Sequence, residues 1–311
     1  MVIDRIDVLL STYNGLLYLG EQIDSLLNQT YDNWRLLIRD DGSSDGTLDI
    51  VKSYQKRFPD KIEIVKDSGE NIGPCKSYER LLMVSTSPYV MFCDQDDVWL
   101  PDKILYSLQV MKDAEKKYGG VIMTFSDLQI ADQHLKLLHD SYLKFMKIPS
   151  HCVNNPYYIV HNCPVNACTV MLNNLARDCC IPFGKSALMH DWWCAVICGF
   201  SGRIVLMNES TILYRQHAGS VFGAPANPDK VFPIYTYIFR FVLRILFNYR
   251  SAKKLIVSHR DRICQALEAG RKTGFGFKII RYFIELFLGK YWFPFLGVIV
   301  PSLRGKMWRY P

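Results

Sequence analysis

Residues 6–40 read IDVLLSTYNGLLYLGEQIDSLLNQTYDNWRLLIRD, and this segment decides the fold. It opens with an apolar, β-like run at residues 6–13 and closes with a second apolar run, RLLI, that ends at Asp40. Between the two runs, apolar residues recur at the spacing of one helical face. These residues are Leu16, Leu19, Ile23, Leu26 and Leu27. The segment therefore predicts a strand, a helix and a second strand.

The same alternation continues downstream. Leu48 and Val51 begin a second helical pattern, KIEIV at residues 61–65 resembles a strand, and YVMFC at residues 89–93 resembles another. Pro74 is suited to the first position of a helix between those two strands. Strands alternating with helices predict an α/β fold with a parallel sheet covered on both faces. Further strands are expected in residues 121–130 and 202–214, with a helix from about His190.

The composition separates the chain into two regions. The 311 residues are 49% hydrophobic and 22% charged, which is typical of a globular protein. The net charge is +7, yet residues 240–311 hold 15 Lys and Arg against three acids. Their cations alternate with bulky apolar residues, as in VFPIYTYIFRFVLRILFNYR, so an anionic membrane surface is expected as partner, and no nucleic acid. We therefore expect a catalytic domain over residues 1–223 and a basic, amphipathic helical region over residues 224–311.

The compartment is inferred from the cysteines and from the ends of the chain. The ten cysteines lack zinc-ligand spacing and no signal-like segment opens the chain, so reduced cysteines, among them Cys163, Cys168, Cys179 and Cys180 as buried thiols, and a cytoplasmic protein are expected. The uncharged stretch YWFPFLGVIVPSL is too short for a spanning helix. The prediction is peripheral attachment to the inner face of the plasma membrane. The alternative is that these helices pack on the catalytic domain or on a second subunit, giving a homo-oligomer.

Polar residues follow three of the predicted strands. Thr12, Tyr13 and Asn14 come after the first strand, Asp40 and Asp41 after the second, and Asp94 after the fourth. Ligands of open α/β sheets bind beyond the carboxyl ends of the strands, so the three strand ends are expected to meet in one crevice. The segment DDGSSDGT also suits a structural turn and a helix cap, and we assign that role to residues 43–46.

The motif CDQDDVW places Asp94, Asp96 and Asp97 within four residues. Their mutual repulsion would be costly directly after a buried strand unless a cation neutralised it. All-oxygen ligation favours Mg²⁺ or Mn²⁺ over zinc. The alternative is a helix N-terminus before Pro101, where acids are favourable without any metal.

Taken in order, VLLSTYNG, RDDGSSDGT, ENIG, CDQDDVW, HDWW and YRQH resemble the motifs of the inverting family 2 glycosyltransferases of GT-A fold. The resemblance covers about residues 4–223. It implies a Rossmann-like, mixed but mostly parallel sheet flanked by helices, a nucleotide-diphospho-sugar donor and a divalent metal. The combination of NIGPCKSYERLL, DQDDVW and HDWW is most similar to bacterial rhamnosyltransferases of cell-surface polysaccharide synthesis. This implies dTDP-rhamnose as donor, with a UDP-hexose as the alternative, and a glycan or lipid-linked acceptor.

The resemblance also implies the roles of individual residues. Asp94, Gln95 and Asp96 hold the diphosphate, with Asp94 on the ribose or the metal and Asp96 on the metal. An acceptor hydroxyl must lose its proton as it attacks the anomeric carbon, and Asp191 matches the base position. An ordinary acid in the first turn of a helix is the other interpretation of Asp191. The nucleoside is assigned to Thr12, Tyr13, Asp40 and Asp41, and its base pocket to Asn71 and Gly73.

The chemistry of YRQH adds two candidates. The planar guanidinium of Arg215 suits contact with a phosphate. His217, which follows an Asp-x-Asp element in the chain, is expected as the third metal ligand, and a structural histidine is the alternative.

Two other functions would use some of the same residues. A nucleotidyltransferase also needs paired aspartates and a metal, but a Gly-rich, basic triphosphate loop is expected near its N-terminus, and STYNGLLYLG has no Lys or Arg. A non-catalytic, membrane-bound sugar-binding scaffold is the third possibility. The acids at positions 41, 94, 96 and 191 favour a working transferase over a scaffold.

Overall fold

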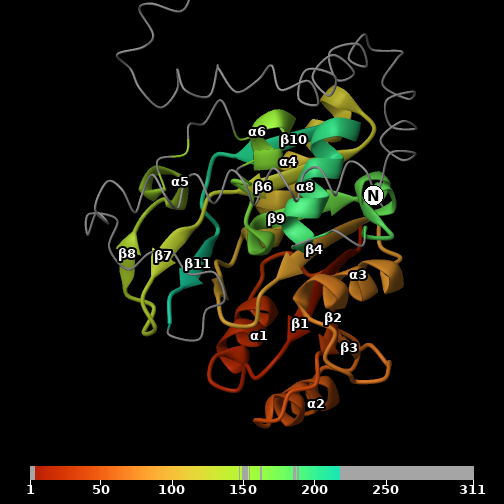
Figure 1. Ribbon diagram of the computed structural model, residues 1–311. Helices are drawn as coiled ribbons and strands as arrows, with labels where there is room; N and C mark the ends of the chain where they lie inside the picture. Colours follow the sequence, from red (N-terminus) through yellow and green to blue (C-terminus); the bar gives the residue numbers. More distant parts are fainter. Residues whose placement is uncertain are drawn as a thin grey trace, which may run out of the picture. The chain divides into compact units, whose positions relative to one another are not determined.

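The computed structural model describes residues 4–217, except residues 147, 149–152, 154, 162, 185–186 and 188. Its centre is a seven-stranded sheet with the order β10-β6-β9-β4-β1-β2-β3 (Figure 1). These strands are β1 (Ile6–Thr12), β2 (Trp34–Asp40), β3 (Ile62–Ile64), β4 (Tyr89–Cys93), β6 (Ile122–Ser126), β9 (Val170–Asn173) and β10 (Arg203–Met207). The expected α/β fold is confirmed.

Alternate side chains of the central strands point to opposite faces of the sheet, and helices bury both faces. Val8 and Leu10 of β1 face a core that contains α1 (Leu19–Leu27), α2 (Thr47–Arg57) and α4 (Lys103–Tyr118). Leu9 faces the other core, with α3 (Pro74–Val84), α7 (Asn174–Cys180) and α8 (His190–Ser201). The remaining short helices are α5 (Tyr142–Phe145), α6 (Pro156–His161) and η2 (Ala167–Thr169).

Strand β9 interrupts the parallel arrangement. It runs antiparallel to β4 on one side and to β6 on the other, whereas β4, β1, β2 and β3 pair in parallel. The sheet is therefore mixed but mostly parallel, as the family resemblance implied. The carboxyl ends of β4, β1 and β2 lie side by side, which confirms the expected meeting of three strand ends.

A second, four-stranded sheet has the order β5-β11-β7-β8. Its strands are β5 (Val98–Trp99), β7 (Gln129–Ala131), β8 (Leu137–His139) and β11 (Ile212–Arg215). Strand β5 follows the Asp94–Asp97 loop directly and pairs with β11, through Ile212 opposite Trp99. This pairing brings Arg215 and His217, at the end of β11, back to the aspartates.

The expected elements of the first hundred residues are confirmed, with one local difference. Leu16 was expected on the apolar face of the first helix, but α1 begins only at Leu19 and Leu16 is exposed. Among the cysteines expected to be buried, Cys168 and Cys180 are buried, Cys163 is partly buried and Cys179 is exposed.

No helix in the described part of the chain has both the length and the apolar character needed to cross a membrane. The predicted basic helices of residues 224–311, and the domain boundary before them, lie outside the described residues.

Candidate active site

Asp40 is held in the turn that follows β2. Its Oδ1 accepts hydrogen bonds from the hydroxyls of Thr12 (2.8 Å) and Ser43 (2.6 Å), and its Oδ2 accepts one from the Ser43 N–H (2.9 Å). The Thr12 bond ties the end of β1 to the end of β2. Asp40 thus shapes the loop on which the nucleoside is expected to lie.

Asp41 fixes the loop that contains Asn71 and Gly73. Its carboxylate is 2% exposed and accepts hydrogen bonds from the N–H groups of Ile72 (2.8 Å) and Gly73 (2.9 Å) and from the guanidinium of Arg39 (2.5 Å). Gly73 has φ of 79°, which favours glycine directly before Pro74 opens α3. The structure therefore brings Asp41, Asn71 and Gly73 to the same strand end, as expected.

Arg39 was not expected at this site. It is 1% exposed and also pairs with Asp67, donates to the Ser77 hydroxyl (2.6 Å) and donates to the Glu70 carbonyl (2.8 Å). The sequence did contain a signal for this role, since Arg39 lies near the end of an apolar strand, directly before two acids. A buried charge is almost always paired, so an ion pair with one of these acids could have been predicted.

The loop after β4 carries the acidic motif. Asp96 Oδ2 lies 2.8 Å from His217 Nε2. Asp94 Oδ1 lies 3.2 Å from the hydroxyl of Tyr78. Burial, reinforced by the charges of Asp96 and Asp191, raises the pKa of Asp94 to about 7. The three expected metal-site residues, Asp94, Asp96 and His217, therefore belong to one loop and to the end of the strand beside it.

Asp97 and Arg215 connect this loop to β11. Asp97 is completely buried and accepts a hydrogen bond from the Arg215 backbone N–H (3.0 Å). The Arg215 guanidinium, 2% exposed, donates to the carbonyls of Asp96 (2.8 Å) and Gln133 (2.7 Å) and pairs with Glu21. These contacts bind Arg215 to the acidic loop, and the phosphate contact expected from its planar guanidinium stays a prediction.

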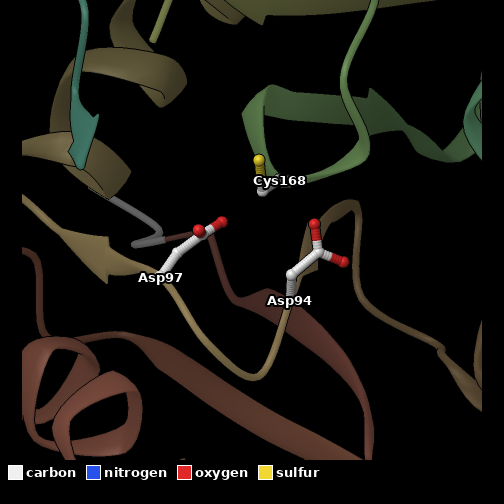
Figure 2. Close-up of side chains that lie close together, drawn as sticks. All are labelled: Asp94, Asp97 and Cys168. Carbon is white, nitrogen blue, oxygen red and sulfur yellow. The ribbon is translucent and has the colours of Figure 1, made fainter. Parts of the chain in front are cut away.

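Asp94 and Asp97 also form a cluster with Cys168 (Figure 2). One ligand atom from each of the three residues lies within 4.8 Å of the others. Burial raises the pKa of the Cys168 thiol and of Asp97 well above their usual values. Asp97 and Cys168 are completely buried, and a thiol is a softer ligand than Mg²⁺ or Mn²⁺ prefers, so this cluster is better explained as internal packing behind the loop than as the metal site.

Asp191 lies in the first turn of α8. Its Oδ1 accepts a hydrogen bond from the Trp192 N–H (2.7 Å), and burial raises its pKa to about 6. A carboxylate with this pKa is ionised at neutral pH and is more basic than an exposed aspartate. It therefore has the protonation state and the basicity that a general base requires.

An aromatic stack links Asp94 to the start of α8. The Tyr78 ring lies 3.8 Å from the ring of His190, at an interplanar angle of 19°, and the Tyr78 hydroxyl reaches Asp94 and the Cys93 carbonyl. His190 is 2% exposed, and neither of its ring nitrogens has a hydrogen-bond partner within the described residues. Burial lowers its pKa to about 3, so the imidazole is neutral. The contact between Tyr78 and Asp94 was not expected from the sequence.

The geometry is matched by comparisons with known proteins. A family model described as glycosyl transferase family 2 matches residues 7–166, just over half of the chain. The chain belongs to glycosyl transferase family 2. This confirms the family resemblance noted in the sequence. The matched range contains Asp40, Asp41, Asp94 and Asp96 but not Asp191.

Two curated relatives illustrate the similarity. The chain is 28% identical over 227 residues to the dTDP-rhamnosyl transferase RfbG of Shigella flexneri, covering 69% of this chain and 74% of RfbG. It is 23% identical over 267 residues to an Escherichia coli protein named UDP-Glc:alpha-D-GlcNAc-diphosphoundecaprenol beta-1,3-glucosyltransferase WfgD. This match covers 80% of this chain and 98% of WfgD. The match to an uncharacterized glycosyltransferase of Nostoc is shorter and spans 34% of that protein.

Solved structures share the fold at low sequence identity. The mannosyltransferase PcManGT of Pyrobaculum calidifontis, in complex with GDP-Man and Mn²⁺, aligns with a TM-score of 0.57 at 14% identity, covering 92% of this chain and 81% of that one. TarS of S. aureus, in complex with UDP-GlcNAc, aligns with a TM-score of 0.53 at 15% identity, covering 82% of this chain and 72% of the TarS chain. These likenesses support the fold.

Proposed function

We propose that the chain is an inverting glycosyltransferase that moves a sugar from a nucleotide-diphospho-sugar to a hydroxyl of a glycan or lipid-linked acceptor in bacterial surface polysaccharide synthesis. The observation that carries the proposal is the pairing of Asp96 with His217 beside Asp94, at the strand end where Thr12, Asp40 and Asp41 meet. The similarity to RfbG and WfgD favours a dTDP- or UDP-linked donor, with dTDP-rhamnose first.

A divalent metal fits the residues at this site. Asp96 Oδ2 and His217 Nε2 lie 2.8 Å apart, Asp94 stands two residues before Asp96 in the same loop, and carboxylate oxygens are ligands that Mg²⁺ and Mn²⁺ prefer. Burial, followed by the negative charges of Asp96 and Asp191, raises the pKa of Asp94, and a bound cation would favour its ionised form. Asp94, Asp96 and His217 are the proposed ligands of Mn²⁺ or Mg²⁺. When bound, such an ion would offset the negative charge that develops on the leaving diphosphate.

The chain supplies the remaining chemistry. Tyr13, half exposed beside Thr12 and Asp41, is proposed to contact the nucleoside, and the loop of Asn71 and Gly73 to border the base. Asp191 takes the proton of the acceptor hydroxyl while the hydroxyl oxygen attacks the anomeric carbon. The bond to the nucleoside diphosphate breaks on the opposite face, so the configuration inverts without a covalent enzyme intermediate.

Binding and turnover of nucleotide sugars test the proposal. The full chain is titrated with dTDP, UDP and GDP, with and without Mn²⁺, and incubated with dTDP-rhamnose or UDP-glucose and a lipid-linked acceptor. We expect metal-dependent binding of dTDP or UDP and a glycosylated product. Binding without any transfer or donor hydrolysis would favour the scaffold, and release of pyrophosphate from a nucleoside triphosphate would favour a nucleotidyltransferase.

A further inference from the structure

The side chain of Gln95 is bonded to the backbone of Tyr13. The Tyr13 N–H donates to Gln95 Oε1 (2.8 Å), and Gln95 Nε2 donates to the Tyr13 carbonyl (3.0 Å). The paired register of β1 and β4 ends at Leu10 opposite Cys93, so the amide adds one more link between the two strands where their loops begin. We refer to this pair of hydrogen bonds as the Gln95 clamp.

Gly15 makes room for the clamp. A Cβ added at Gly15 would lie 2.4 Å from Gln95 Oε1 and 2.6 Å from its Cδ, much closer than van der Waals contact. The backbone cannot simply retreat, because the Gly15 N–H donates to the Thr47 hydroxyl (2.8 Å). Glycine at this position therefore leaves space for the Gln95 amide, and its φ is not in the left-handed region.

The other side of Tyr13 is fixed as well. Asn14 has φ of 47°, its N–H donates to the Ser43 hydroxyl (2.9 Å), and its Oδ1 accepts from the Ser44 N–H (2.9 Å). The backbone of Tyr13 is thus held between the acidic loop and the loop after β2, while half of the Tyr13 side chain stays exposed.

We infer that Gln95 is a positioning residue for the nucleoside, acting through the backbone of Tyr13 rather than on the diphosphate. Although Gln95 stands between Asp94 and Asp96, its carbonyl oxygen and its amino group both contact Tyr13. The clamp sets the distance between the residue that contacts the nucleoside and the acids that face the diphosphate. This inference rests on the proposed function.

Four variants of the full chain test the inference: Gln95→Ala, Gly15→Ala, the double variant, and Gly20→Ala as a control. The first two break the same clamp, because the alanine at position 15 displaces the Gln95 amide. Gly20 lies nearby at the start of α1, where an added Cβ meets nothing closer than 3.7 Å. Dissociation constants for UDP and dTDP are measured with and without Mn²⁺, and thermal melting checks the fold.

We expect each single variant to bind the preferred nucleotide about tenfold more weakly, the scale of one or two neutral hydrogen bonds, with Mn²⁺ and without it. The double variant should bind no more weakly than either single variant, because the clash at position 15 disappears with the glutamine. Gly20→Ala should bind like the wild type. If Gln95→Ala does not fold, Gln95→Met keeps the length of the side chain and replaces it.

Three results would overturn the inference: unchanged affinity in both single variants, effects that multiply in the double variant, or a loss confined to Mn²⁺-containing buffer, which would place Gln95 on the diphosphate. If the wild type itself bound neither nucleotide, the proposed function would fail, and this inference with it.

Discussion

At the scale of single residues, the proposed metal ligands Asp96 and His217 allow metal binding to be tested without disturbing the fold. Both side chains are only partly buried, so removing either one takes away a ligand atom without opening a cavity in the core. The paired acids 40 and 41, by contrast, are bonded to backbone N–H groups that shape their loops.

We expect Asp96→Ala to abolish the increase in nucleotide affinity that Mn²⁺ brings, while the melting temperature without metal changes little. Calorimetric titration of dTDP or UDP, with and without Mn²⁺, measures this increase. Asp49→Ala, which removes an exposed acid from α2, serves as the matched control. Wild-type metal dependence in Asp96→Ala would show that the ligands are misassigned.

Asp191→Asn is expected to bind the donor normally and to lose at least about a hundredfold in turnover, the usual scale for a general base. The amide keeps the shape of the carboxylate but cannot take a proton. Near-normal turnover would exclude Asp191 as the base. Asp127 would be the next carboxylate to test, although it already accepts bonds from Ser141 and from the Leu128 and Leu143 N–H groups.

The pH dependence of turnover follows from the raised pKa of Asp191. A base works only when deprotonated, and its pKa of about 6 lies above the usual value, so the rate should be constant at neutral pH and fall as the pH drops below about 6. Initial rates at saturating substrate between pH 5 and pH 8 measure the profile. A rate that stays flat down to pH 5 would contradict the assignment.

Local sequence predicted the acids of the site but not the residues that support them. Apolar runs in the sequence show where strands end, and four acids of the site lie at such ends: Asp40, Asp41, Asp94 and Asp96. Tyr78 could not be recognised from its spacing, because an aromatic residue on the apolar face of a helix is ordinary core. Its hydroxyl acquires a role only once β4 places Asp94 beside α3.

At the scale of elements, helix α3 serves both ends of the site. The residues before it bond to Asp41, the Tyr78 hydroxyl reaches Asp94, and Glu79 accepts the N–H of Phe183 (2.5 Å) in the segment leading to α8. Helix α3 therefore contacts both the proposed donor site and the segment that precedes the proposed base, Asp191.

The stack between α3 and α8 depends on the ring of His190, not on its nitrogens. We expect His190→Phe to unfold at a urea concentration no lower than the wild type, because it keeps a ring and removes two unbonded nitrogens from the core. His190→Ala leaves a cavity beside Tyr78 and should lose about 2–4 kcal/mol of unfolding free energy. Equal destabilisation by both variants would indicate a hydrogen-bonding role for the imidazole.

The junction of α8 and β10 has no space for a side chain at Gly202. A Cβ there would lie 1.9 Å from the Val121 carbonyl oxygen, which itself accepts the Arg203 N–H. We expect Gly202→Ala to lower the free energy of unfolding by about 1–3 kcal/mol or more, measured by urea denaturation. Gly20→Ala, without such a contact, is the control, and equal stability of the two variants would refute the steric explanation.

Most elements of the first hundred residues could be predicted because each is a separate apolar run between turn residues. Strand β9 was not expected. Its four residues, VMLN, carry no turn signal, and they form a strand only because β4 and β6 offer two open edges between which they fit. These residues form a strand because they pair with segments that are distant in the sequence, and a local sequence pattern does not predict such pairing.

At the scale of the whole molecule, the charge of residues 224–311 predicts attachment to an anionic membrane, where a lipid-linked acceptor would reside. We expect the full chain to float with vesicles that contain phosphatidylglycerol at low salt, and to dissociate at high salt, since each basic residue near the surface contributes about 1 kcal/mol.

Vesicles of phosphatidylcholine alone are the control for this prediction. A folded chain that never floats, and that sediments as a dimer, would favour the alternative in which the same helices join two subunits.

The antiparallel strand β9 has a consequence for biosynthesis. Strands β1 to β4 with their helices contain most residues of the proposed nucleotide site, but β4 stays an open edge until β9 emerges from the ribosome almost eighty residues later. At about 5–20 residues per second, this exposes β4 for about 4–16 seconds. During that interval the nascent chain has an unpaired apolar edge that a chaperone could shield. Helix α8, with the proposed base Asp191, follows β9, and β11, which leads to His217, follows later still.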